Sequence, residues 1–111
     1  NQPLTRVFYF DYDQSQLSQS DLTALEMHGE ILRNNPERAI VVEGHADERG
    51  SREYNLALGE RRANAIRSFL TAAGVASTQI ESVSYGEERP DDPGHSEAAW
   101  SRNRRAALIY R

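Results

Sequence analysis

The most informative absence in this sequence is that of cysteine, which excludes a disulfide framework, a thiol nucleophile and a thiolate metal site. The chain also lacks an apolar run long enough to span a bilayer, and no signal peptide is visible in it. Its 111 residues are about the length of one domain and can bury a core without disulfides. We therefore expect residues 1–111 to form a single domain.

An excess of positive charge is also missing, because 13 Lys+Arg stand against 17 Asp+Glu and the formal net charge is −4. Proteins that bind nucleic acids without a special motif depend on basic side chains that neutralise phosphates. The weakly acidic balance of this chain therefore argues against a nucleic-acid partner.

Four segments have the residue pattern of strands. Arg6–Phe10 ("RVFYF") and Ala39–Ala46 ("AIVVEGHA") are rich in β-branched, aliphatic and aromatic residues, which favour buried strands. Ile80–Gly86 ("IESVSYG") alternates between apolar and polar residues, and Arg105–Tyr110 ("RAALIY") is predicted as the strand that closes the chain.

Two further segments place apolar residues at helical spacing. The first begins at Asp21 and stops at residues 34–36 ("NNP"), and the second runs from about Arg52 to Ala73, with Gly74 just beyond its end. Residues 87–100 are dense in Pro, Gly and Asp and are predicted to form a loop. The order β-α-β-α-β-β predicts an α+β fold, a two-layer sandwich with two main helices packed on a four-stranded mixed sheet.

The second predicted helix carries two polar residues on its buried side. At about 100° per residue, Asn55 and Arg62 fall in the same arc as the apolar residues of this helix, whereas Arg61 falls on the solvated side. A guanidinium near a core must be paired and hydrogen-bonded, because the desolvation of an isolated charge is costly. The position of Arg62 therefore needs an explanation.

Two explanations fit Arg62. Its guanidinium could form a structural ion pair with an acid of the preceding loop, either Asp47 or Glu48. Alternatively, it could line a pocket and bind the carboxylate of a ligand through its planar fork, while Asp47 binds the ligand's ammonium. An acid and an arginine displayed together suit a zwitterion, such as the head group of an amino acid.

Four motifs, in this order, resemble those of outer membrane protein A-like (OmpA-like) domains that bind peptidoglycan. They are "VFYFDYD", "EGHADERGSREYNLALGERRANAIRSFL", "VSYGEERP" and "EAAWSRNRRAALIY". Within that group, "GHADERG" and "YNLALGERRA" are similar to the peptidoglycan-associated lipoproteins of the Tol–Pal system. The resemblance covers nearly the whole chain and implies an OmpA-like fold.

The resemblance implies non-covalent binding of peptidoglycan through the diaminopimelate residue of its stem peptide. Asp47 and Arg62 match the family's aspartate and arginine at this site. Asp11 matches the loop residue whose backbone helps to hold the ligand carboxylate, while Asn55 and Leu58 match positions that line the same groove. We expect no catalytic residue, no cofactor and no metal.

The resemblance also implies partners and a location. It indicates binding to stem peptides with meso-diaminopimelate and to a TolB-type periplasmic propeller protein, which we expect to compete for one face. An upstream lipid anchor, outside this sequence, would hold the protein on the periplasmic face of the Gram-negative outer membrane. The protein would thereby tether that membrane to the cell wall, with roles in envelope integrity and cell division. Since the chain starts at Asn1, we expect its first residues to end a linker from the anchor.

Other polar residues suggest chemistry less strongly. His45, Asp47 and Glu48 could form a metal site, but a lone histidine beside acids is more often structural. Asp11 and Asp13 could serve as the carboxylate pair of a muramidase-like enzyme. Acids two residues apart in a polar loop are usually solvated, so a binding module is the stronger hypothesis.

The locally basic segment at residues 101–107 ("SRNRRAA") could be interpreted as a nucleic-acid patch. Under the family resemblance, Asn103 and Arg104 are instead expected to be structural and to hold the end of the chain against the long helix.

Overall fold

The computed structural model describes residues 4–111, so residues 1–3 of the expected linker lie outside the described part. The helices and strands follow the predicted order, with two short helices added, one before the third strand and one before the fourth. The elements are β1 (Val7–Tyr9), α1 (Gln19–Asn34), β2 (Ile40–His45), α2 (Arg52–Ala72), the 3₁₀ helix η1 (Ser77–Gln79), β3 (Ile80–Gly86), α3 (Glu97–Asn103) and β4 (Arg105–Tyr110).

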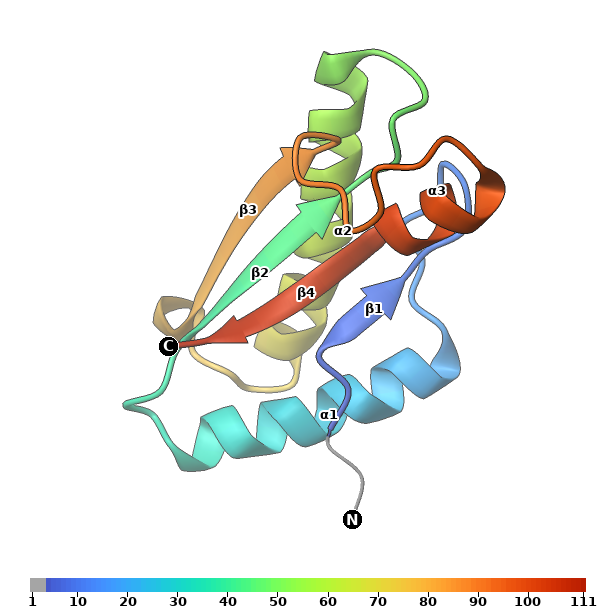
Figure 1. Cartoon of the computed structure of the whole chain (residues 1–111). Coiled ribbons are helices and arrows are strands. Elements are labelled where there is room, and N and C mark those ends of the chain that lie inside the picture. Colours follow the sequence, from blue (N-terminus) through green and yellow to red (C-terminus); the bar gives the residue numbers. More distant parts are fainter. Residues whose placement is uncertain (1–3) are drawn as a thin grey trace.

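The four strands form one mixed sheet in the order β1-β4-β2-β3. β2 runs parallel to β3, while β4 pairs antiparallel with both β1 and β2. Figure 1 shows α2 lying along the sheet behind β2 and β3, with α1 crossing near β1. The predicted α+β architecture, with two main helices on a four-stranded mixed sheet, is confirmed.

The core lies between the sheet and these two helices. Alternate strand residues such as Phe8, Val42 and Leu108 are buried against Leu25 of α1 and Ile66 of α2. This alternation is what a sheet with one covered face requires, since successive side chains point to opposite faces. Within residues 4–111, none of the helices combines the length and the apolarity that a membrane crossing needs.

Local side chains fix where the helices begin and end. Ser18 caps α1 in a reciprocal capping box with Asp21, so the helix begins at Gln19, slightly earlier than the predicted Asp21. Ser51 caps α2 by accepting a hydrogen bond from the backbone N–H of Tyr54. Gly74 has a φ of 99°, the left-handed conformation predicted for the residue beyond this helix.

The prediction of a continuous loop over residues 87–100 is wrong at its end, because α3 begins at Glu97. Ser96 caps this helix by accepting a hydrogen bond from the backbone N–H of Ala99. With seven residues, α3 is too short to show a helical period, and the Pro- and Gly-rich residues before it obscure its start. It lies beside the loop that follows β1 (Figure 1).

A contact between two glycines brings α2 unusually close to β2. A Cβ atom on Gly44 would lie 1.7 Å from the backbone oxygen of Gly59. A Cβ atom on Gly59 would lie 2.3 Å from the Ser84 hydroxyl and 2.9 Å from the backbone oxygen of Gly44. Any side chain at Gly44 would therefore push the helix away from the end of the strand, and with it the residues that α2 contributes there.

We predict that Gly44→Ala lowers the free energy of unfolding by about 3 kcal/mol or more, because the obstructing atom belongs to the backbone and cannot rotate away. Gly29→Ala is the matched control. The three atoms nearest to a Cβ there belong to the side chains of Arg33 at 3.2 Å, Leu70 at 3.6 Å and Ala73 at 3.9 Å, so we expect a change below about 1 kcal/mol. Urea unfolding followed by circular dichroism measures both, and equal losses would contradict the proposed backbone contact.

Candidate functional site

A small pocket lies where the loop after β1, the turn after β2 and the first half of α2 meet. Its volume is about 50 Å³. It is lined by Tyr12, Asp13, Asp47, Arg49, Gly50, Tyr54, Asn55, Leu58 and Arg62. Four of the five residues predicted for the site, Asp47, Asn55, Leu58 and Arg62, thus share one cavity, although up to 15 positions separate them in the sequence.

Arg62 is fully buried, and its guanidinium donates hydrogen bonds to three backbone carbonyls. Nε donates to Gln14 at 2.8 Å, Nη1 to His45 at 2.8 Å and Nη2 to Asp11 at 3.2 Å. The ion pair with Asp47 or Glu48, one of the two explanations considered for Arg62, is not formed, because no carboxylate among residues 4–111 lies within 4.0 Å of this guanidinium. The hydrogen-bonding donors of Arg62 therefore connect α2 to the loop after β1 and to the end of β2.

Neutral carbonyls accept hydrogen bonds from three of the five N–H donors of Arg62 without neutralising its charge. Burial lowers the pKa of Arg62 to about 10, and the nearby Asp47 carboxylate partly opposes that shift. The guanidinium remains protonated at neutral pH. It therefore presents a buried positive charge at the wall of the pocket.

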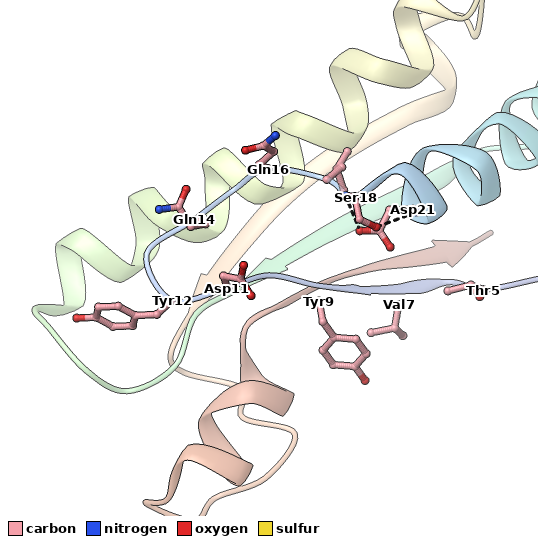
Figure 2. A pocket seen from close by; sticks show the side chains of 10 residues that line it. Thr5, Val7, Tyr9, Asp11, Tyr12, Gln14, Gln16, Ser18 and Asp21 are labelled. Carbon is pink, nitrogen blue, oxygen red and sulfur yellow. Dashed lines mark hydrogen bonds between the residues drawn. The ribbon is translucent and has the colours of Figure 1, made fainter.

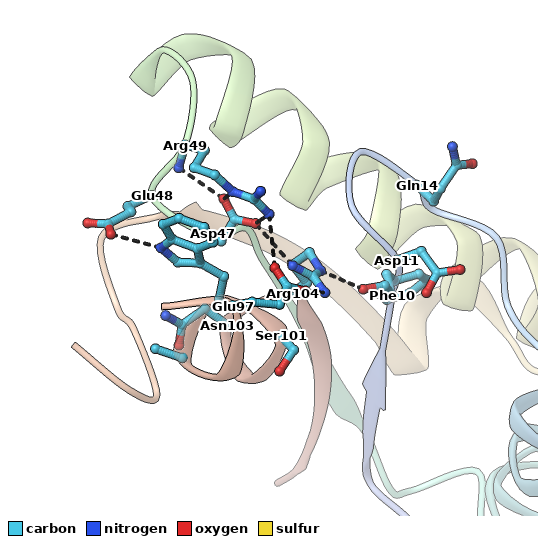
Figure 3. Close-up of polar contacts among 12 residues, drawn as sticks. Phe10, Asp11, Gln14, Asp47, Glu48, Arg49, Glu97, Ser101, Asn103 and Arg104 are labelled. Carbon is cyan, nitrogen blue, oxygen red and sulfur yellow. Dashed lines mark hydrogen bonds and ion pairs between the residues drawn. The ribbon is translucent and has the colours of Figure 1, made fainter. Parts of the chain in front are cut away.

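Asp47 supplies the opposite charge and is only 4% exposed. Its Oδ1 accepts hydrogen bonds from the backbone N–H of Arg49 at 2.9 Å and from Arg49 Nε at 3.2 Å. Its Oδ2 accepts from Arg49 Nη2 at 2.7 Å and from Arg104 Nη1 at 3.5 Å (Figure 3). Burial alone would raise the pKa of Asp47, but the hydrogen bonds from Arg49 and Arg104 outweigh it and lower the pKa.

Arg104 and Asn103 stabilise this region through partners other than the expected long helix. Arg104 Nε donates to the backbone oxygen of Phe10 at 2.9 Å, and its Nη2 donates to Glu97 at 2.9 Å. Asn103 Oδ1 accepts from the backbone N–H groups of residues 91 and 92 at 2.7 and 3.0 Å. These hydrogen bonds join the end of the chain to the loop after β1, to α3 and to the 91–92 turn, and none of them reaches α2.

The two other predicted residues on α2 complete the wall of the pocket. Asn55 is 1% exposed and donates from Nδ2 to the Glu87 carboxylate at 2.8 Å. Leu58 is 5% exposed and is the apolar residue of the lining. Asn55 can be buried beside the apolar Leu58 because the Glu87 carboxylate accepts a hydrogen bond from its side chain.

Asp11 approaches the site only through its backbone oxygen, the acceptor for Arg62 Nη2. Its side chain instead lines a much larger open groove of about 980 Å³ along β1 (Figure 2). Asp13 has a positive φ of 56° and accepts a hydrogen bond from the hydroxyl of Tyr54. Asp11 and Asp13 therefore face different cavities, unlike the carboxylate pair of a glycosidase, which flanks a single bond.

The three residues considered for a metal site have separate partners. The ring of His45 packs against Tyr85 at 5.6 Å between centroids, and burial lowers its pKa to about 4. Glu48 accepts hydrogen bonds from Trp100 Nε1 at 2.8 Å and from His95 Nδ1 at 2.6 Å. In the part of the chain that the structure describes, no three His, Asp or Glu side chains converge in a manner suited to a metal ion.

Sequence reasoning missed Arg49, although it lies only two positions after Asp47. Its guanidinium is 4.1 Å from the ring centroid of Tyr12 and 4.2 Å from that of Trp100. Both aromatic rings come from segments remote in sequence, so no local pattern connects them with Arg49. The one available signal was its proximity to an aspartate already assigned to the site.

We predict that Arg62→Ala lowers the free energy of unfolding by about 3–5 kcal/mol, since it removes a large buried side chain together with its three hydrogen bonds to backbone carbonyls. Arg62→Lys should recover only part of this loss, because one ammonium cannot reproduce the planar fork. Arg61→Ala should change stability by less than about 0.5 kcal/mol, because Arg61 is exposed on the same helix. Denaturant unfolding measures the stability of the three variants, and an Arg62→Ala protein as stable as the wild type would refute the structural role of Arg62.

Comparisons with known proteins agree with the fold and the motifs. The OmpA family matches residues 9–104. A peptidoglycan-associated lipoprotein of Pseudomonas aeruginosa is 52% identical over 101 residues, which cover 91% of this chain and 60% of the relative. One from Pasteurella multocida is 48% identical over 102 residues, or 92% of this chain and 68% of the relative. The chain thus spans about 60% of the length of the first of these relatives.

Solved structures show the same relationship. The peptidoglycan-associated lipoprotein of Burkholderia pseudomallei superposes with a TM-score of 0.94 at 45% identity, covering 96% of this chain and 91% of that one. The C-terminal domain of Helicobacter pylori MotB has a TM-score of 0.86 at 23% identity over 96% of this chain and 84% of that one, which shows a common fold only. The resemblance drawn from the four motifs is confirmed, and the chain belongs to the OmpA family.

Proposed function

We propose that this domain binds peptidoglycan non-covalently through the diaminopimelate residue of the stem peptide. The observation that carries the proposal is the meeting of a buried arginine and a buried aspartate in one pocket, Arg62 and Asp47. Relatives at 48–52% identity are named peptidoglycan-associated lipoproteins, which supports the same ligand. Binding would tether the outer membrane to the cell wall.

The chemistry of diaminopimelate complements these two charges. Its distal carbon carries both an ammonium and a carboxylate, and it lies outside the peptide backbone of the stem. A guanidinium has five N–H donors, and Arg62 uses three of them on carbonyls, so two remain for a ligand carboxylate. Asp47 offers the counter-charge for the ammonium, while Asn55 and Leu58 lie beside both.

We propose binding without hydrolysis. Asp11 and Asp13 line different cavities, and the relatives are named as lipoproteins rather than enzymes. Purified sacculi provide the simplest assay: the domain should sediment with them and release no soluble fragments. Release of fragments by the pure domain would indicate an enzyme.

The location and the remaining partners follow from the same family. We propose that the full-length protein is lipid-anchored at the periplasmic face of the Gram-negative outer membrane. There it would act in the Tol–Pal system, with roles in envelope integrity and cell division. No cofactor or metal enters this function.

We predict that removal of either charge of the ligand weakens binding. A stem peptide with free meso-diaminopimelate should bind about tenfold to a hundredfold more tightly than one whose distal carboxylate is amidated, or one whose distal amine is acetylated. Each change costs one charge-assisted contact, roughly 1.5–3 kcal/mol. Changing the ligand avoids the instability expected of Arg62→Ala, and isothermal titration calorimetry measures all three affinities.

The matching protein variant is Asp47→Asn, which preserves shape but removes the charge. It should lose affinity for the diaminopimelate peptide by a similar factor, while Arg61→Ala on the solvated side of α2 should bind as the wild type does. Equal affinity of the wild type for all three peptides would refute recognition through the zwitterion.

We predict that a TolB-type periplasmic propeller protein competes with the stem peptide. Polar and charged residues concentrate in the turn that follows β2, which contributes Asp47, Arg49 and Gly50 to the lining of the pocket. A partner docked on this turn would therefore lie against the residues that contact the ligand. Fluorescence anisotropy of a labelled stem peptide, titrated with the propeller protein, should show displacement; a ternary complex at full affinity would contradict a shared face.

A further inference from the structure

We propose that the side chain of Arg49 is the gate of this pocket. In the closed structure its guanidinium occupies the place on Asp47 that the ligand's ammonium must take, so the ligand binds by displacing it from between Tyr12 and Trp100. The inference rests on the proposed function, because the ligand it concerns is the ammonium and carboxylate of diaminopimelate.

The first argument is that the acceptors of Asp47 are fully used. A carboxylate has about four lone-pair sites on its two oxygens. Asp47 accepts four hydrogen bonds: three from Arg49, through its backbone N–H, Nε and Nη2, and one from Arg104 Nη1. An incoming ammonium therefore has to replace at least one donor that is already present.

The second argument identifies the donor that can leave. Arg104 has a side chain only 8% exposed, and hydrogen bonds to the backbone oxygen of Phe10 and to Glu97 hold it in place. The backbone N–H of Arg49 is fixed by the turn itself. The side chain of Arg49 is 30% exposed and is the donor with access to solvent. Its guanidinium is thus the one that a ligand can displace.

The third argument is the size of the pocket. With a volume of about 50 Å³, it is far smaller than the groove of about 980 Å³ along β1. Because Arg49 forms part of the lining, its departure both enlarges the cavity and uncovers Asp47.

The surroundings of Arg49 make the closed position favourable but reversible. Its guanidinium lies between the rings of Tyr12 and Trp100, at 4.1 and 4.2 Å. Exposed cation–π contacts of this kind contribute only about 0.5–1 kcal/mol each. Glu97 Oε2 lies 3.9 Å from Arg49 Nη2 on the solvent side, so a released guanidinium can retain a carboxylate partner.

The gate is tested by removing its charge. Arg49→Met keeps an unbranched apolar side chain similar to the stem of arginine but removes the guanidinium and leaves Asp47 accessible, so its affinity for the diaminopimelate stem peptide should rise about threefold to tenfold by calorimetry. Arg49→Lys keeps a cation that competes for Asp47 and should bind within about twofold of the wild type. The matched control is Arg52→Met, since Arg52 lies three positions further and pairs with Glu88; its affinity should not change.

A second readout follows the gate itself. Trp100 is the single tryptophan, and the Arg49 guanidinium lies over its ring. Addition of the stem peptide should change the tryptophan emission of the wild type and of Arg52→Met, but change that of Arg49→Met much less. Melting temperatures of the variants confirm that each is folded during the titrations.

The possible outcomes separate the gate from the proposed function. Tight binding by the wild type, with equal or weaker binding by Arg49→Met, overturns the gate, and weaker binding would mean that Arg49 contacts the ligand directly. If Arg49→Met binds more tightly but its tryptophan emission changes as much as that of the wild type, the displacement of Arg49 from Trp100 is overturned. If the wild type binds no stem peptide at all, the proposed function is refuted, and the gate falls with it.

Discussion

The hydrogen bonding of Arg62 is the interaction on which the site depends. One guanidinium on α2 donates to carbonyls of the loop after β1 and of the end of β2, so it joins three segments at the mouth of the pocket. A structural role and a binding role appear as alternatives when only the helical pattern is considered. In the folded protein they are compatible, because the carbonyls use three of the five N–H donors and do not neutralise the charge.

The approach of α2 to the sheet makes this arrangement possible. Gly44 and Gly59 let the helix contact the strand through backbone atoms, and Arg62 lies one turn further along the helix from that contact. A larger residue at either glycine would move the guanidinium away from the carbonyls that it must reach. The position of the Arg62 guanidinium therefore depends on the absence of side chains at Gly44 and Gly59.

Much of the fold could be predicted from the sequence, since strong periodic patterns decide it. The bounds predicted for β3 and β4 agree with the structure, and the N-terminal end of α2 lies at Arg52 as expected. The helix α3 was missed because seven residues are too few to reveal a period. Within the site, the burial of Arg62 could be predicted from the helical wheel, but its partners could not. Every residue type has a backbone carbonyl, so a sequence pattern cannot indicate which carbonyls accept hydrogen bonds from Arg62.

The distribution of partners around the two charges accounts for a site that is stable without its ligand. Buried charges must be hydrogen-bonded, or the fold loses stability. A direct pair between Arg62 and Asp47 would satisfy both, but a zwitterion would then have to break that pair before it could bind either charge. Here Arg62 is satisfied by carbonyls and Asp47 by Arg49 and Arg104. If the site binds a zwitterion as proposed, its cationic half would accept a carboxylate without losing a carbonyl hydrogen bond, and only its anionic half would exchange partners. The exchanged contact would be that of the partly exposed Arg49 side chain, whose displacement leaves the buried hydrogen bonds of Arg62 and Arg104 intact.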